Sequence, residues 1–188
     1  MFLDSIKVLL YIPNIIGYIR ILFLIYFWKY NNYIYYILSY LLDGVDGFLA
    51  RKFNQCSIFG YYLDMLIDRI SSGYILTLCS YVNPLYIIFL INEEISHLIV
   101  LIDCYINNEH QKETKENYLI SNLYLRSKYV MFLSIIGSEA YTINFVYKII
   151  KNDVLNITLF FIFIFRQIAC FQRMLTSTKR LLNKLKIN

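Results

Sequence analysis

The sequence predicts an all-α integral membrane protein with six transmembrane helices and a short N-terminal helix at the membrane interface. Of its 188 residues, 59% are hydrophobic and only 16% are charged. The mean hydropathy is +0.51, which lies outside the range of ordinary soluble domains. The apolar residues form six runs, each close to the roughly 20 residues that cross a bilayer as a helix. Lysine and arginine also gather in alternate connections between the runs.

The expected elements follow one another along a single domain, residues 1–188. Residues 1–11 carry two charges among apolar residues and end before Pro13, a residue favoured in the first turn of a helix. We expect this segment to lie on the membrane surface. A basic tail, residues 173–188, follows the last span. The expected spans are residues 12–29, 33–50, 59–81, 84–104, 127–148 and 153–172.

The positions of lysine and arginine predict the orientation. If the N-terminus is cytosolic, twelve of the 18 basic residues fall on that side, and only Lys29, Lys148 and Lys151 fall on the other. The remaining three lie within spans. Cytoplasmic connections are enriched in lysine and arginine, so we expect both termini in the cytosol. The net charge of +5 fits this bias and attraction to anionic head groups. We expect no nucleic-acid partner.

Four aspartates occupy two neighbouring spans, where an ionisable residue is costly and usually functional. Asp43 and Asp46 are three residues apart, so they share one face of the second predicted helix. Asp64 and Asp68 lie one turn apart near the start of the third. The short connection makes these helices antiparallel neighbours whose acidic faces can meet. Because converging carboxylates repel each other, we expect them to bind a divalent cation, and oxygen ligands favour Mg²⁺ or Mn²⁺ over zinc.

Small residues accompany these acids. Gly44, Gly47, Ala50 and Gly60 would keep the wall of a cavity low, so that a ligand as bulky as a nucleotide could approach the backbone. Arg51 follows directly and is placed to hold a phosphate in fork geometry. The alternative is that the small residues merely allow helices to pack closely in the membrane. Close packing explains the glycines but not the acids.

The acids and small residues together form one spaced pattern. The order is Asp43-x-x-Asp46-Gly47-x-x-Ala50-Arg51, eight residues, and then Gly60-x-x-x-Asp64-x-x-x-Asp68. At all eight positions it resembles the signature of the CDP-alcohol phosphatidyltransferases. YIPNIIGYIRI, residues 11–21, resembles the opening of the first helix in that family. RKFNQCSIFGYYLDMLIDR, residues 51–69, is similar to the form in its eukaryotic phosphatidylinositol synthases. The resemblance covers nearly the whole chain.

The resemblance implies the CDP-alcohol phosphatidyltransferase fold and a transfer of the phosphatidyl group from CDP-diacylglycerol to myo-inositol, with release of CMP. It further implies two Mg²⁺ or Mn²⁺ ions, an endoplasmic reticulum location with a cytosolic active site, and a homodimer. Asp68 is the implied general base. The implied metal ligands are Asp43, Asp46, Asp64 and Asp68. The residues implied to bind CDP-diacylglycerol are Gly47, Ala50, Arg51, Ser57 and Gly60.

The acceptor alcohol is less closely determined by these motifs. Arg126 and Lys128 are candidates for binding it, although Lys128 stands where many relatives would have arginine. Glycerol 3-phosphate, serine and inositol phosphate stay open as acceptors. Arg69 either pairs with a carboxylate or substrate at the site or forms a structural ion pair with Glu139 or another acid. Two other classes stay open: a divalent metal transporter with acids along its pathway, and a non-catalytic scaffold, against which the intact Asp68 argues.

Overall fold

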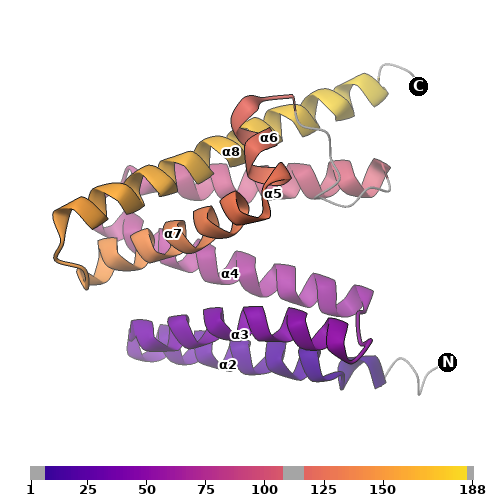
Figure 1. The fold of residues 1–188 in the computed structure, drawn as a ribbon, viewed down its shortest axis with the longest axis horizontal. Coiled ribbons are helices and arrows are strands. Elements are labelled where there is room, and N and C mark those ends of the chain that lie inside the picture. Colours follow the sequence, from indigo (N-terminus) through magenta and orange to yellow (C-terminus); the bar gives the residue numbers. More distant parts are fainter. Residues whose placement is uncertain (1–6, 108–116, 186–188) are drawn as a thin grey trace. The chain divides into compact units, whose positions relative to one another are not determined.

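The helices of the computed structural model correspond to the apolar runs of the sequence (Figure 1). The structure describes residues 7–107 and 117–185, and every regular element within these ranges is a helix. A further short helix, α6, precedes the fifth run. The helices are α2 (Ile12–Tyr30), α3 (Tyr33–Lys52), α4 (Ile58–Val82), α5 (Tyr86–Asn107), α6 (Leu119–Arg126), α7 (Lys128–Tyr147) and α8 (Asp153–Leu185).

Two asparagines form the turn between α2 and α3. Asn31 adopts a left-handed conformation, with φ of 49°, and its backbone N–H donates to the carbonyl of Phe27. The side chain of Asn32 then accepts a hydrogen bond from the backbone N–H of Ile34 at 3.0 Å. Asparagine tolerates left-handed backbone and is a preferred N-cap. The chain therefore reverses within two residues, and Figure 1 shows α2 and α3 side by side.

The connection from α3 to α4 is equally short and is tied to the start of α2. Asn54 has a φ of 53°, which turns the chain after α3. The Ser57 hydroxyl accepts a hydrogen bond from the backbone N–H of Gly60 at 3.0 Å and so caps α4. The backbone N–H of Ile12 donates to Oε1 of Gln55 at 2.9 Å. These bonds position the polar ends of three helices together.

The chain divides into two compact units, Met1–Tyr74 and Ile75–Asn188, with the boundary inside α4. In the first unit, Gly17 of α2 lies against α4, because a Cβ at this glycine would be 3.0 Å from Leu63. The ring of Phe27 is fully buried and contacts those of Tyr36 and Tyr74, with centroids 5.4 and 5.1 Å away. These contacts hold α2, α3 and the first part of α4 together.

The second unit is built around an apolar cluster of Leu76, Cys79, Tyr86 and Phe163. In this unit α8 contacts α5, α6 and α7. A Cβ at Gly137 of α7 would approach Ile162 of α8 to 2.7 Å, so glycine is needed for the close approach of these two helices.

A buried ion pair network joins α5, α7 and α8. The Arg166 guanidinium donates to the carboxylates of Glu93 and Glu139, the latter at 3.1 Å, and to the Ser138 hydroxyl at 3.1 Å. Gln167 also donates to Glu93, at 3.3 Å. Glu139 therefore has Arg166 as a structural partner. Because breaking a buried pair leaves an uncompensated charge, this network is a strong constraint on the unit.

Besides these apolar clusters, the helices bury polar side chains and expose large apolar ones. The sides of α2 and α5 that are buried within the protein carry polar side chains such as Arg20 and Glu93, whereas large apolar residues such as Ile19, Leu22 and Ile91 are exposed. A lipid environment satisfies such exposed apolar surfaces. Within the described ranges, three helices, α2, α7 and α8, are long and apolar enough to cross a membrane by length and composition. The count of six spans stays a prediction.

Several boundaries differ from those expected. Helix α8 has 33 residues and is therefore about 50 Å long at 1.5 Å per residue, so residues 173–185 of the expected tail continue the last helix. Residues 186–188 lie outside the described ranges. Of the expected interfacial helix, residues 7–9 are helical, and residues 1–6 also lie outside the described ranges.

Replacing Arg166 with methionine should lower the thermal unfolding midpoint in detergent. The change leaves two buried carboxylates without their cation, which costs about 3–5 kcal/mol, or on the order of 10 °C for a chain of this size. Intrinsic fluorescence during heating measures the midpoint. Lys151→Met, at an exposed position, is the control, and an equal shift in both variants would contradict the structural role of the network.

Candidate functional site

All four aspartates of the spaced pattern converge on one arginine. Arg20 lies on α2, and only 2% of its side chain is exposed. Its Nη1 contacts Asp46 at 2.8 Å and Asp64 at 2.6 Å. Its Nη2 contacts Asp43 at 2.8 Å and Asp68 at 2.6 Å. Each nitrogen therefore bridges one carboxylate from α3 and one from α4.

The carboxylates differ in their access to solvent. The exposed fraction of the side chain is 10% for Asp46 and 35% for Asp43. It rises to 46% for Asp64 and 44% for Asp68. Arg20 thus closes one side of the cluster, while the two α4 carboxylates remain open to small polar molecules.

Three of these acids fit a divalent cation. Asp43, Asp64 and Asp68 each offer a carboxylate oxygen, and these oxygens lie within 4.8 Å of one another. Mg²⁺ and Ca²⁺ bind oxygen ligands at about 2.0–2.6 Å, so one ion can reach all three. Asp46 lies outside this group and is connected to it through Arg20. The donor set consists of carboxylate oxygens alone, which suits a hard cation.

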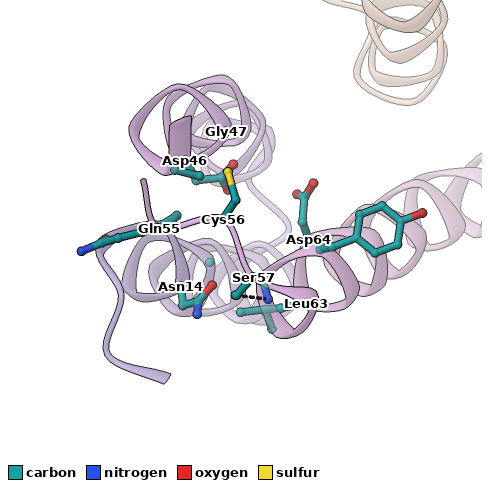
Figure 2. Close-up of a pocket in the computed structure, with 13 residues that line it drawn as sticks. Asn14, Asp46, Gly47, Gln55, Cys56, Ser57, Leu63 and Asp64 are labelled. Atoms are coloured by element: carbon teal, nitrogen blue, oxygen red, sulfur yellow. Dashed lines mark hydrogen bonds between the residues drawn. The ribbon is translucent and has the colours of Figure 1, made fainter. Parts of the chain in front are cut away.

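A pocket of about 240 Å³ adjoins the acids (Figure 2). In this view Asp46 lies at the upper left and Asp64 at the right, with Cys56 between them, and Asn14, Ser57 and Leu63 lie below. All of the lining belongs to the first unit. The lining residues are Pro13, Asn14, Gly17, Asp46, Gly47, Ala50, Gln55, Cys56, Ser57, Gly60, Tyr61, Leu63 and Asp64.

Two glycines of the pocket lie against polar side chains. A Cβ at Gly60 would lie 2.7 Å from Oδ1 of Asn14 and 3.1 Å from Oγ of Ser57, so any other residue would displace these polar groups. At Gly47, a Cβ would lie 3.6 Å from Nη1 of Arg51. The guanidinium of Arg51 therefore folds over the Gly47 backbone, next to the pocket.

The residues expected to bind substrate are distributed as follows. Gly47, Ala50, Ser57 and Gly60 line the pocket, and the exposed Arg51 lies over Gly47. Gly44 is not a lining residue, and a Cβ there would meet nothing within 4 Å. The sequence-based role of Gly44 in the cavity wall therefore stays a prediction.

The two candidates for acceptor binding belong to the second unit. Arg126 is the last residue of α6 and Lys128 is the first of α7. Both are exposed. Ser127 between them caps α7 by accepting a hydrogen bond from the backbone N–H of Val130 at 3.4 Å. This cap fixes the start of the helix that carries Lys128.

Sequence analysis missed the contribution of α2. Arg20 is one of the three basic residues expected within spans, and an arginine at membrane depth indicates an acidic partner. Asn14 is buried against Gly60, and its Nδ2 donates to the backbone carbonyl of Val8 at 2.6 Å. Gln55 was also missed. The sequence signal for these residues is the resemblance of residues 11–21 and 51–69, which contain them, to the family.

Comparison with known proteins decides the family. The profile of the CDP-alcohol phosphatidyltransferases matches residues 9–165. The chain belongs to the CDP-alcohol phosphatidyltransferase family. The family match includes α2, α3 and α4, which build the acid cluster, as well as α5, α6 and α7. Fold class and family thus agree with the expectations from the sequence.

The relatives described here carry the same enzyme name. The chain is 40% identical over 93 residues to CDP-diacylglycerol–inositol 3-phosphatidyltransferase 1 of Arabidopsis thaliana, an alignment covering 46% of this chain and 41% of the relative. The CDP-diacylglycerol–inositol 3-phosphatidyltransferase of Candida albicans is 31% identical over 147 residues, or 71% and 64% of the two chains. The chain thus spans less than two thirds of the length of these curated relatives. No solved structure matches it.

Replacing Asp64 with asparagine should weaken Mn²⁺ binding by at least about tenfold, because even groups behind the metal ligands contribute 10–100-fold to affinity. Titration of purified protein, with free Mn²⁺ followed by electron paramagnetic resonance, measures the dissociation constant. Asp153→Asn removes a similar charge from the exposed start of α8 and should leave affinity unchanged. Equal affinity in the Asp64→Asn and wild-type proteins would remove Asp64 from the cation site.

Proposed function

We propose that this protein transfers the phosphatidyl group of CDP-diacylglycerol to myo-inositol, forming phosphatidylinositol and CMP. The main support is the convergence of Asp43, Asp64 and Asp68 beside a pocket lined by small and polar residues. The names of the relatives, CDP-diacylglycerol–inositol 3-phosphatidyltransferases from plants and fungi, support the choice of donor and acceptor.

The aspartates are proposed to hold two Mg²⁺ or Mn²⁺ ions, with Asp46 completing the set around Asp43, Asp64 and Asp68. When bound, such ions neutralise the negative oxygens of the pyrophosphate and make CMP a better leaving group. The nucleotide is proposed to occupy the pocket, against Gly47 and Gly60. Arg51 reaches over Gly47 and can donate two parallel hydrogen bonds to a phosphate.

Asp68 is proposed to act as the general base. Its side chain is 44% exposed, so a water-soluble polyol can approach it. Asp68 accepts the proton of an inositol hydroxyl while the hydroxyl oxygen attacks the phosphorus that carries the lipid. The bond between this phosphorus and the bridging oxygen of CMP breaks, and CMP leaves. A positioned base contributes about two to four orders of magnitude to such a step.

The remaining expectations extend this proposal. We propose that both termini and the site face the cytosolic side of the endoplasmic reticulum membrane. The site lies near the membrane surface, because CMP and inositol are water-soluble whereas the diacylglycerol remains in the bilayer. Arg126 and Lys128 are proposed to bind the acceptor. The 188 residues are proposed to form one membrane domain, which assembles as a homodimer. The acids cluster on facing parts of α3 and α4, which argues against a transport pathway, where acids would be distributed through the membrane depth.

Purified protein in detergent should release CMP from CDP-diacylglycerol when myo-inositol and Mn²⁺ or Mg²⁺ are present. A panel of acceptors, containing myo-inositol, glycerol 3-phosphate, serine and inositol phosphate, tests the choice of alcohol. We expect release with myo-inositol only, and none after chelation of the metal. Release with another acceptor but not with myo-inositol would retain the phosphatidyl transfer and reject the inositol assignment.

The Asp68→Asn variant separates base from ligand. We expect turnover to fall by about two to four orders of magnitude, because the inositol proton loses its acceptor, while CDP-diacylglycerol binding stays within a few-fold of wild type. Filter binding of labelled donor and CMP release provide the two measurements. A loss of Mn²⁺ affinity as large as that of Asp64→Asn would instead make Asp68 chiefly a metal ligand.

A further inference from the structure

Arg20 occupies the centre of the group of acids that is proposed to hold the metal. Its four contacts of 2.6–2.8 Å engage one oxygen of each aspartate. Three of these aspartates, Asp43, Asp64 and Asp68, also form the triad whose oxygens could meet at one cation. The same carboxylates would therefore serve both the guanidinium and a divalent ion.

These contacts are strong and directed. Hydrogen bonds between an arginine and a carboxylate are about twice as strong as neutral ones, and the 2%-exposed Arg20 side chain is shielded from water. Its Nε has no hydrogen-bond partner among the residues that the structure describes, so the whole attachment runs through the two Nη atoms. A single positive charge thereby holds α3 to α4.

We propose that Arg20 is an internal counter-cation that shares the acid cluster with the divalent metal, so that metal entry requires Arg20 to release carboxylates. In the metal-free protein Arg20 keeps the acids of α3 and α4 together. As a cation arrives, Arg20 gives up some of its contacts, and the affinity for the metal is lowered by this competition. This inference rests on the proposed metal site and not on the identity of the acceptor alcohol.

The charge of the acid cluster affects the order in which the metal and the nucleotide bind. With all four carboxylates ionised, they and the one guanidinium give the metal-free cluster a formal charge of minus three. Such a cluster repels a negatively charged pyrophosphate. Because Asp46 and Asp64, the partners of Nη1, also line the pocket, the repulsion acts on the pocket itself. On this proposal, metal binds before the lipid-linked nucleotide.

The Arg20→Gln variant tests the competition by two measurements without substrate. The apparent affinity of a ligand is reduced by the fraction of protein in the competent state. If Arg20 holds the acids in at least nine molecules of ten, its removal should tighten Mn²⁺ binding about tenfold or more. The thermal midpoint of the metal-free variant should fall, because the acids repel each other without Arg20, and its rise on Mn²⁺ addition should exceed that of wild type.

Lys29→Gln is the matched control. This substitution removes the same charge from the same helix. Lys29 lies in the last turn of α2, nine residues or about 13 Å beyond Arg20. Its Mn²⁺ affinity and midpoint should match wild type. Arg20→Lys retains the charge without the two-armed geometry, so its affinity should lie between those of wild type and Arg20→Gln; this variant serves if Arg20→Gln fails to fold.

The outcomes distinguish the proposals. Tighter Mn²⁺ binding with a lower metal-free midpoint supports the competition. Unchanged or weaker binding in both Arg20 variants, with wild type still binding Mn²⁺, overturns it and makes Arg20 a residue that positions the acids. Absence of Mn²⁺ binding in wild type, Arg20→Gln and Arg20→Lys alike overturns the metal site itself, and the inference with it.

Discussion

The contact between Arg20 and the acids of two helices is the interaction on which the first unit depends. Four ionised carboxylates could not share this small volume without a cation, because their mutual repulsion would push α3 and α4 apart. Arg20 supplies the cation from α2, and its fork reaches both helices at once. The chemistry of the site and the packing of three helices therefore follow from the same requirement for positive charge.

The rest of the first unit brings the helices to this point. The turn at Asn31 and Asn32 places α2 against α3, and the cap at Ser57 starts α4 beside them. Gly60 leaves room for Asn14 next to the acids. The pocket therefore results from the short connections between the helices and from the glycine at position 60.

The buried charges of the second unit are paired in a different way. Among the residues that the structure describes, Arg166 pairs with two carboxylates, Glu93 and Glu139. It is buried together with Ser138 and Gln167. The acids near Arg20 keep up to 46% of the side chain exposed, whereas those near Arg166 are buried. This difference separates a structural ion pair from a site that small ligands can reach.

The sequence was informative where the physical signal is local. Apolar runs and the spacing of Asp43, Asp46, Asp64 and Asp68 predicted the helices and the convergence of the acids, because helical periodicity determines which residues share a face. The partners from distant segments, Arg20 for the aspartates and Arg166 for Glu93, could not be assigned, because pairing across helices depends on tertiary packing. Nor could the sequence predict that α8 continues to Leu185, since a basic amphipathic segment suits a helix or a surface tail equally well.

Anomalous diffraction at the manganese edge, from crystals of the protein grown with Mn²⁺, tests the central claim most directly. The account predicts a peak bounded by the carboxylates of Asp43, Asp64 and Asp68, together with a shift of the Arg20 guanidinium away from at least one of them. Crystals that contain Mn²⁺ but show no peak in this cluster, with Arg20 still bridging all four aspartates, would contradict it.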